Sequence, residues 1–201
     1  EWQGKQRLSQ AGLSIPRARL TDAAGATESA NELGFPVVVK LVSADLPHKT
    51  EAGAVKIGLA DIHAVEQAVQ EITASVAVYA PGIPTDSFLV EAMAAKPVAE
   101  LLVGVRRDPA FGLALTIAGG GTLVELLRDA TTLLLPASRG DIAEALSSLM
   151  VAQLIAGYRG APAGNLEACL DAIAAICSFA TGADDLVELD INPLLVGTEG
   201  T

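Results

Sequence analysis

The 201-residue sequence has few aromatic residues, few basic residues and no long uninterrupted hydrophobic segment. Lysine and arginine number 13 against 24 aspartates and glutamates, which gives a net charge of −11, and aromatic residues make up 3%. Nucleic-acid binding needs a basic surface and usually aromatic side chains for base stacking, so the composition argues against that function. No apolar run approaches the ~20 residues that cross a bilayer, so we expect no membrane span.

Cysteine is equally scarce. Cys169 and Cys177 lie in a segment with helical periodicity, about 12 Å apart along the helix axis at 1.5 Å per residue, which is too far for a disulfide. We therefore expect two reduced core cysteines, as is typical of a cytoplasmic protein. The chain starts at Glu1 without a charged and then apolar leader, and we expect it to be a piece of a longer polypeptide.

The remaining composition is that of a globular α+β protein, with 51% hydrophobic and 18% charged residues. A chain of this length buries about 70% of its unfolded surface, which is enough for a substantial core. Hydrophobic periodicity predicts helices over residues 2–12, 23–33, 62–76, 141–155 and 165–180. It predicts strands over residues 37–40, 54–59, 88–93, 98–107, 113–118 and 186–196. A break at residues 81–84 begins the second half of the chain.

One segment, residues 34–58, concentrates the chemistry of the first half. Val37, Val38 and Val39 precede Lys40, which is the pattern of a buried strand that delivers one charge to a site. A polar loop with His48 follows before the next strand. Because a buried ammonium is tolerated only when it is paired, we expect Lys40 to meet an anion and the loop to close over that anion.

The predicted last strand carries two carboxylates and an amide. Alternation places Glu188, Asp190 and Asn192 on one face of the strand, and oxygen ligands of this kind suit a Mg²⁺ that also binds substrate phosphates. The alternative is an ordinary solvated strand face. A closing Asn-Pro, the Lys40 strand and a Gly119–Gly121 loop whose amides can approach an anion favour the metal site.

Six blocks in this order resemble the ATP-grasp domain of NDP-forming acyl-CoA synthetases, relatives of the succinyl-CoA synthetase β subunit. The resemblance extends over nearly the whole chain, and the blocks read GFPVVVK, SADLPHKTEAG, ELLVGVRRDPAFG, GGGTLVELLRD, GYRG and ELDINPLL. The resemblance implies an ATP-grasp fold with two α+β lobes that bind Mg²⁺ and ATP or ADP. It also implies the reaction, in which acid, CoA and ATP interconvert with acyl-CoA, ADP and phosphate through acyl phosphate and phosphohistidine.

The resemblance assigns roles to individual residues. Lys40 corresponds to the lysine on the nucleotide phosphates, and the backbone of residues 91–93 to the interlobe segment that reads the adenine edge. His48 corresponds to the histidine that passes the phosphoryl group to the nucleotide. Asp190 and Asn192 correspond to the metal pair, with Glu188 as an outer partner. The complete set implied for ATP is Lys40, Glu91, Ala92, Met93, Glu100, Gly120 and Gly121.

Other positions agree with the family blocks without requiring a catalytic role. These positions are Arg107, Asp108, Gly120, Gly121, Glu125, Asp129 and Arg159. A role in a salt bridge or a turn explains each of them as well as a catalytic role does. The sequence departs from the family at Ala54, where a glycine is usual. A Cβ there is expected to narrow the motion of the loop.

The resemblance also predicts the domain organisation. Residues 20–92 form the N-terminal lobe, and residues 1–19 and 93–201 form the C-terminal lobe. The expected partners are the CoA-binding and ligase domains or subunit of the same enzyme, and the sequence is compatible with a homo-oligomer. Two functions stay open at this point. One is a catalytic nucleotide-binding domain, and the other is a non-catalytic regulatory or scaffolding ATP-grasp domain, as in a fused protein acyltransferase.

Overall fold

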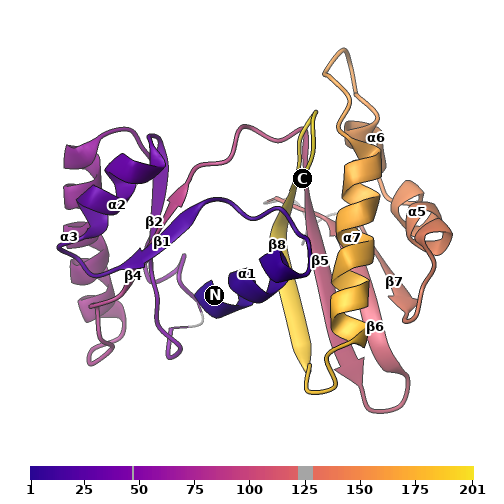
Figure 1. Cartoon of the computed structure of the whole chain (residues 1–201), viewed down its shortest axis with the longest axis horizontal. Coiled ribbons are helices and arrows are strands. Elements are labelled where there is room, and N and C mark those ends of the chain that lie inside the picture. Colours follow the sequence, from indigo (N-terminus) through magenta and orange to yellow (C-terminus); the bar gives the residue numbers. More distant parts are fainter. Residues whose placement is uncertain (47, 122–128) are drawn as a thin grey trace. The chain divides into compact units, whose positions relative to one another are not determined.

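The computed structural model describes residues 1–46, 48–121 and 129–201 (Figure 1). The chain divides into two compact units. Unit 1 comprises Glu1–Gln6 and Ile15–Ala94, and unit 2 comprises Arg7–Ser14 and Ala95–Thr201. Residues 1–6 and 15–19, which the sequence analysis assigned to the second lobe, therefore belong to unit 1, and the helix α1 (Trp2–Gln10) contributes residues to both units.

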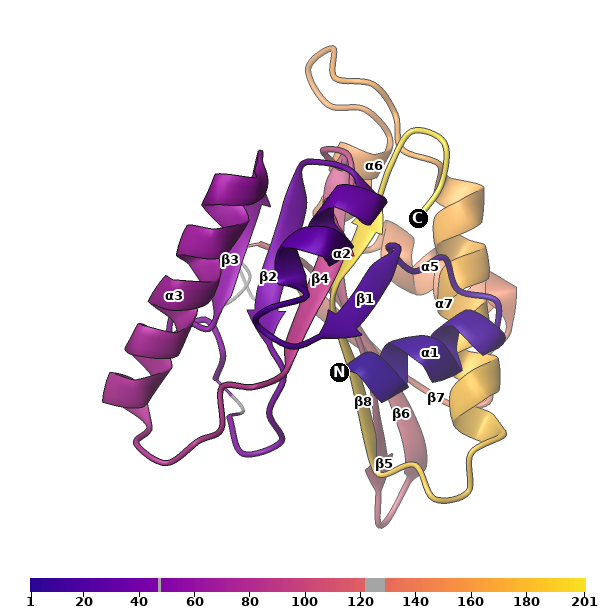
Figure 2. The same ribbon diagram turned by 60° about the vertical axis from the view of Figure 1, so that its left-hand side comes forward.

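Unit 1 is an antiparallel four-stranded sheet covered on one face by two helices. Its elements, in chain order, are β1 (Ala18–Thr21), α2 (Ala26–Leu33), β2 (Val37–Leu41), β3 (Val55–Leu59), α3 (Ile62–Tyr79) and β4 (Phe88–Ala92). The strand order is β1-β4-β2-β3. Helices α2 and α3 lie side by side in Figures 1 and 2 and pack on the sheet, where their apolar residues form one core with alternate residues of β2 and β4.

Local sequence signals account for the helix starts in this unit and the next. The Asp61 side chain accepts a hydrogen bond from the Ala64 amide (2.9 Å) and begins α3, and Asn165 does the same for Ala168 (3.0 Å) at the start of α7. These side chains satisfy amides that have no partner within the first turn of a helix. Both predicted helix starts are confirmed.

Unit 2 is a second antiparallel four-stranded sheet with helices on one face. It contains β5 (Ala99–Asp108), β6 (Gly112–Gly119), β7 (Ala130–Leu134), α5 (Arg139–Ser147), α6 (Val151–Ile155), α7 (Leu166–Thr181) and β8 (Glu188–Val196). The strand order is β7-β6-β5-β8. Alternate residues of β5 are buried, whereas Glu100, Leu102 and Gly104 between them are partly exposed on the opposite face.

The structure differs from the predicted elements at three places. Strands β1 and β7 were not predicted, and the predicted helix over residues 141–155 is two helices, α5 and α6. The predicted last strand continues through Asn192 and Pro193, with a register shift opposite Leu102 that marks a bulge. The two cysteines are free and buried in α7, as predicted. Within the described ranges, no helix is both long and apolar enough to cross a membrane.

Candidate functional site

Lys40 projects from the face of the unit 1 sheet that α2 and α3 leave uncovered. Its neighbours Val39 and Leu41 are fully buried in the helix-covered core, so alternation places Lys40 on the opposite face. The β2–β4 register sets Val38 opposite Glu91, which lies diagonally across from Lys40 on the same face. The Lys40 ammonium is 2.5 Å from a carboxylate oxygen of Glu91.

Glu91 is the one buried charged residue among those the structure describes, with 4% of its surface exposed. A carboxylate at this depth must be paired. It has two cationic partners, Lys40 on the adjacent strand and Lys5 from the first turns of α1. Glu91 was predicted to act only through its backbone, but its side chain is the counter-ion of Lys40.

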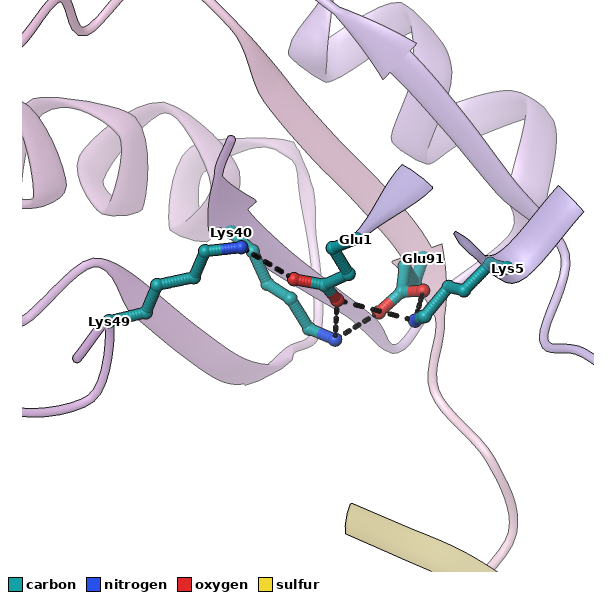
Figure 3. A network of polar contacts seen from close by, with 5 residues as sticks. All are labelled: Glu1, Lys5, Lys40, Lys49 and Glu91. Atoms are coloured by element: carbon teal, nitrogen blue, oxygen red, sulfur yellow. Dashed lines mark hydrogen bonds and ion pairs between the residues drawn. The ribbon is translucent and has the colours of Figure 1, made fainter. Parts of the chain in front are cut away.

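Glu1 completes a chain of alternating charges, which we call the lysine network: Glu1, Lys5, Lys40, Lys49 and Glu91 (Figure 3). One carboxylate oxygen of Glu1 accepts a hydrogen bond from Lys40 (2.9 Å), and the other accepts one from Lys49 (2.7 Å). Three ammonium groups thus share two carboxylates, and the network carries one net positive charge.

The pKa values of this network follow from its geometry. Burial alone would lower the pKa of the Lys40 ammonium, but the charge of Glu91 and the hydrogen bonds to Glu1 and Glu91 raise it above its ordinary value. Burial alone would raise the pKa of Glu1, but hydrogen bonds from Lys40 and Lys49 outweigh it and lower the pKa to about 2. Both groups are therefore charged at neutral pH.

His48 and Lys49 are adjacent in the loop between β2 and β3 but lie in different environments. The His48 side chain is 68% exposed, with Nδ1 3.8 Å from Glu51, whereas Lys49 belongs to the lysine network. Backbone hydrogen bonds from Ala52 to the His48 carbonyl (3.1 Å) and from Ala54 to the Lys49 carbonyl (2.8 Å) shape this loop. His48 is thus an exposed imidazole, free of core packing, and the residue that follows it in the chain belongs to the lysine network.

The family departure at Ala54 has a structural explanation. Ala54 is fully buried in the unit 1 core, together with Ala52. Its methyl group therefore packs inward, against the sheet and helices, and adds apolar contact there.

The predicted adenine-reading segment lies at the end of β4. The amide of Ala92 donates to the Arg17 carbonyl (2.8 Å), and the amide of Met93 donates to the Pro36 carbonyl (3.0 Å). An adenine ring can use these two donors only by displacing those carbonyls. The role of the segment in nucleotide binding stays a prediction.

The two glycines that follow β6, Gly120 and Gly121, lie where the backbone leaves little room for a side chain or has a positive φ angle. The Gly120 amide donates to the Glu100 carbonyl (2.6 Å), and a Cβ at position 120 would lie 2.7 Å from the Glu100 backbone. Gly121 has φ +92°, a conformation that favours glycine. Glu125 lies outside the described residues. Backbone proximity thus explains Gly120 by itself, and its role as an ATP ligand stays a prediction.

Three further family-block residues have structural partners. Asp129 accepts hydrogen bonds from the Met150 and Val151 amides (2.8 and 3.0 Å), so it anchors the start of α6. Arg107 donates to the Leu186 carbonyl (3.0 Å). The Asp108 carboxylate accepts hydrogen bonds from the amides of residues 110 and 111 in the β5–β6 turn (2.7 and 3.0 Å).

The three polar residues of β8 are exposed and alternate with the partly buried Leu189 and Ile191. Although Asp190 is exposed as a residue, partial shielding of its carboxyl from water raises its pKa, and the charge of Glu188 raises it further. A divalent cation would relieve this repulsion between carboxylates, so the donor set of Glu188, Asp190 and Asn192 fits Mg²⁺. Among the residues described, no three His, Cys, Asp or Glu side chains cluster as a metal site, so an amide oxygen, substrate phosphates or water would complete the coordination.

The structure therefore gathers the predicted residues into two sets. Lys40, Glu91 and the His48 loop belong to unit 1, and the β8 carboxylates, Glu100 and the glycines belong to unit 2. The contributions of Glu1, Lys5 and Lys49 were not predicted from the sequence. Glu1 and Lys5 have the (i, i+4) spacing of a helical ion pair, the one local signal that could have drawn attention to them.

Comparison with known proteins identifies the family. The ATP-grasp domain family matches residues 1–201. The β subunit of ADP-forming acetate–CoA ligase II from Pyrococcus furiosus is 30% identical over 202 residues, covering 100% of this chain and 85% of that subunit. The ADP-forming 4-hydroxybutyrate–CoA ligase of Nitrosopumilus maritimus is 29% identical over 201 residues, and this chain spans 29% of its length.

A solved structure gives the same result. Dinucleotide-forming acetyl-coenzyme A synthetase 1 from Ca. Korarchaeum cryptofilum, in complex with coenzyme A, Ca-AMPCP and HgCl+, matches with a TM-score of 0.94 and 31% identity, covering 100% of this chain and 87% of that one. The predicted α+β ATP-grasp fold is confirmed. The chain therefore belongs to the ATP-grasp family and is a homologue of the β subunits of ADP-forming acetate–CoA ligases.

Proposed function

We propose that this chain is the nucleotide-binding part of an ADP-forming acyl-CoA synthetase. In the overall reaction a carboxylic acid, CoA and ATP interconvert with acyl-CoA, ADP and phosphate. The CoA-binding and ligase functions come from partner domains or a partner subunit. The homologous β subunit from Pyrococcus furiosus supports this assignment, because the match covers 100% of this chain and 85% of that subunit.

The observation that carries the proposal is that unit 1 contains both a charged lysine on the uncovered face of its sheet and an exposed histidine in the loop that follows the same strand. Lys40 holds a positive charge on the uncovered sheet face, and His48 follows eight residues later with an exposed ring. Lys40 binds nucleotide phosphates as a point charge. The imidazole of His48 exchanges a phosphoryl group with the nucleotide: an N–P bond forms as the terminal P–O bond breaks, and ADP leaves.

The relatives support the phosphohistidine route. One structure of the Ca. Korarchaeum cryptofilum enzyme, with coenzyme A and Mg-AMPPCP, has its phosphohistidine segment pointing towards the nucleotide binding site. By analogy, an exposed loop histidine can reach a reacting group and then withdraw, the kind of gating motion that loops perform.

The β8 residues supply the metal site of the proposal. Asp190 and Asn192 would hold Mg²⁺, with Glu188 as an outer partner that shapes the local charge. When bound, Mg²⁺ neutralises charge on the nucleotide phosphates. The residues themselves present oxygen donors on an exposed strand face.

Nucleotide binding is tested by calorimetry with ATP and Mg²⁺. Lys40→Ala removes a charge-assisted bond of about 1.5–3 kcal/mol and should weaken binding by roughly one to two decades. Lys56→Ala is the matched control, because Lys56 pairs with Glu71 (2.5 Å) in the same unit but outside the lysine network. Equal affinities of the wild type and Lys40→Ala would remove Lys40 from the site.

Phosphoryl transfer is tested in the complete enzyme with labelled ATP. His48→Ala should abolish acyl-CoA formation and labelling of this chain, and nucleotide affinity should stay within a few fold. His63→Ala is the control, because His63 is 94% exposed in the first turn of α3. Wild-type turnover by His48→Ala would remove His48 from the phosphoryl-transfer route, whereas no acyl-CoA formation by the wild type itself would favour the regulatory or scaffolding function.

A further inference from the structure

Two lysines from separate segments donate hydrogen bonds to a single carboxylate in unit 1, and the Lys5 ammonium lies 3.4 Å from one of its oxygens. Lys40 comes from β2 and Lys49 from the loop that follows, and they bind the two different oxygens of Glu1 at 2.9 and 2.7 Å (Figure 3). Each ammonium thus takes one oxygen of the same small anion. This is the geometry in which two cations bind one phosphate group.

The two carboxylates of the lysine network differ in how firmly they are held. Glu91 lies on the interior strand β4 and its side chain is 5% exposed, so it is a fixed part of the sheet. Glu1 precedes α1 and its side chain is 23% exposed, close to the values of Lys40 and Lys49. Water and solutes therefore reach the Glu1 contacts more readily than those of Glu91.

The charges show what would replace Glu1. Without its carboxylate the network contains three ammonium groups and Glu91, so it carries two net positive charges. A terminal phosphate carries close to two negative charges at neutral pH and has three oxygens that accept hydrogen bonds. It therefore matches the vacated position in charge and exceeds a carboxylate in acceptors.

We propose that Lys40 and Lys49 form a two-lysine clamp for one phosphate group of the nucleotide, and that Glu1 is an internal competitor which the phosphate displaces. The proposal rests on the proposed function in that it takes the nucleotide to bind at Lys40. It adds Lys49 as a phosphate-binding residue next to His48, and it gives the start of α1 a part in regulating access. Lys49 is the residue that directly follows His48 in the chain.

The test measures the affinity of three probes by calorimetry: ATP, inorganic triphosphate and AMP. Lys49→Met should weaken binding of ATP and triphosphate about tenfold, the loss expected for one charge-assisted bond. Glu1→Gln should tighten binding of both by a factor of about ten, because the competing carboxylate is gone. AMP lacks the terminal phosphates, so its affinity should not change in either variant.

Three controls separate binding from folding. Lys56→Met and Glu28→Gln remove the same charges at positions of unit 1 outside the network, Lys56 half-buried and Glu28 exposed, and should leave all three affinities unchanged. Lys49→Arg keeps the charge and should retain most of the triphosphate affinity. Fluorescence of Trp2, the single tryptophan of the chain, reports whether the start of α1 stays folded.

The outcomes distinguish this proposal from the preceding one. Unchanged triphosphate affinity in Lys49→Met, or weaker binding in Glu1→Gln, overturns the clamp even when ATP binds the wild type. Failure of every variant to bind triphosphate also overturns it. If triphosphate follows the expected pattern but ATP and AMP do not bind, the clamp stands as an anion site and the nucleotide function fails.

Discussion

Replacing Glu91 with glutamine should destabilise unit 1 more than any exposed charge change in that unit. The substitution keeps the size of the side chain but removes the charge that Lys5 and Lys40 share. The two ammonium groups then face an uncharged amide, and only Glu1 remains to balance them and Lys49.

The expected loss is about 2–4 kcal/mol. Removing one partner of a fully buried ion pair costs about 3–5 kcal/mol, because the other charge is left unpaired in the low-dielectric interior of the protein. Lys5 and Lys40 keep 23% and 21% of their side-chain exposure, so water recovers part of this loss. Glu32→Gln is the control, since Glu32 and Arg19 form an exposed pair in the same unit. Its removal should cost less than about 1 kcal/mol.

Urea unfolding monitored by Trp2 fluorescence measures the effect, because Trp2 is the first residue of α1 and directly follows Glu1 of the network. The linear dependence on urea gives the change in unfolding free energy. Adding Lys5→Met to Glu91→Gln removes one excess cation and should restore part of the stability, a coupling that a double-mutant cycle isolates. A loss below 0.5 kcal/mol for Glu91→Gln, or strict additivity of the two changes, would refute the assigned counter-ion role.

Three other predictions concern acid stability, a glycine and the thiols. The pKa of Glu1 is about 2 in the folded chain and near 4.5 in the unfolded chain, so its ionised carboxylate stabilises the fold by about 3 kcal/mol at most. This stabilisation should be complete above about pH 5 and lost as the pH falls towards 2. Glu1→Gln should flatten this part of a plot of urea midpoint against pH. Gly120→Ala should cost about 1–3 kcal/mol in thermal unfolding, because its Cβ would meet the rigid Glu100 backbone; an unchanged midpoint would contradict this packing. Burial raises the pKa of Cys169 and Cys177 to about 11, so iodoacetamide at pH 8 should modify them only after urea unfolding, and rapid modification of the native chain would show that they are accessible.

The sequence by itself determined the elements whose signals are local. The valine run before Lys40 produced a strand with one charge on its uncovered face, and Asp61 and Asn165 began helices because their side chains bond amides three residues ahead. Six ordered blocks were sufficient to predict the ATP-grasp fold, since a family pattern over the whole chain is far more specific than any single block.

The two short edge strands could not be predicted from the sequence. Strand β1 has four residues and β7 has five, and both lie at the edge of a sheet, where burial imposes little pattern. Helices α5 and α6 were merged because the apolar spacing continues across residues 148–150. The separation coincides with hydrogen bonds from Asp129, 21 residues away from Met150, that hold the start of α6.

The sequence also required that Lys40 be paired, because an ammonium on a buried strand cannot stay unpaired. Only the tertiary structure decided which residues pair with Lys40. The antiparallel register of β2 and β4 places Glu91 diagonally across from Lys40, and the position of the first turn of α1 brings Glu1 to both Lys40 and Lys49. These partners are 39 to 51 residues apart in the chain, so no local sequence pattern predicts that they meet. Strand pairing and helix packing bring them into contact.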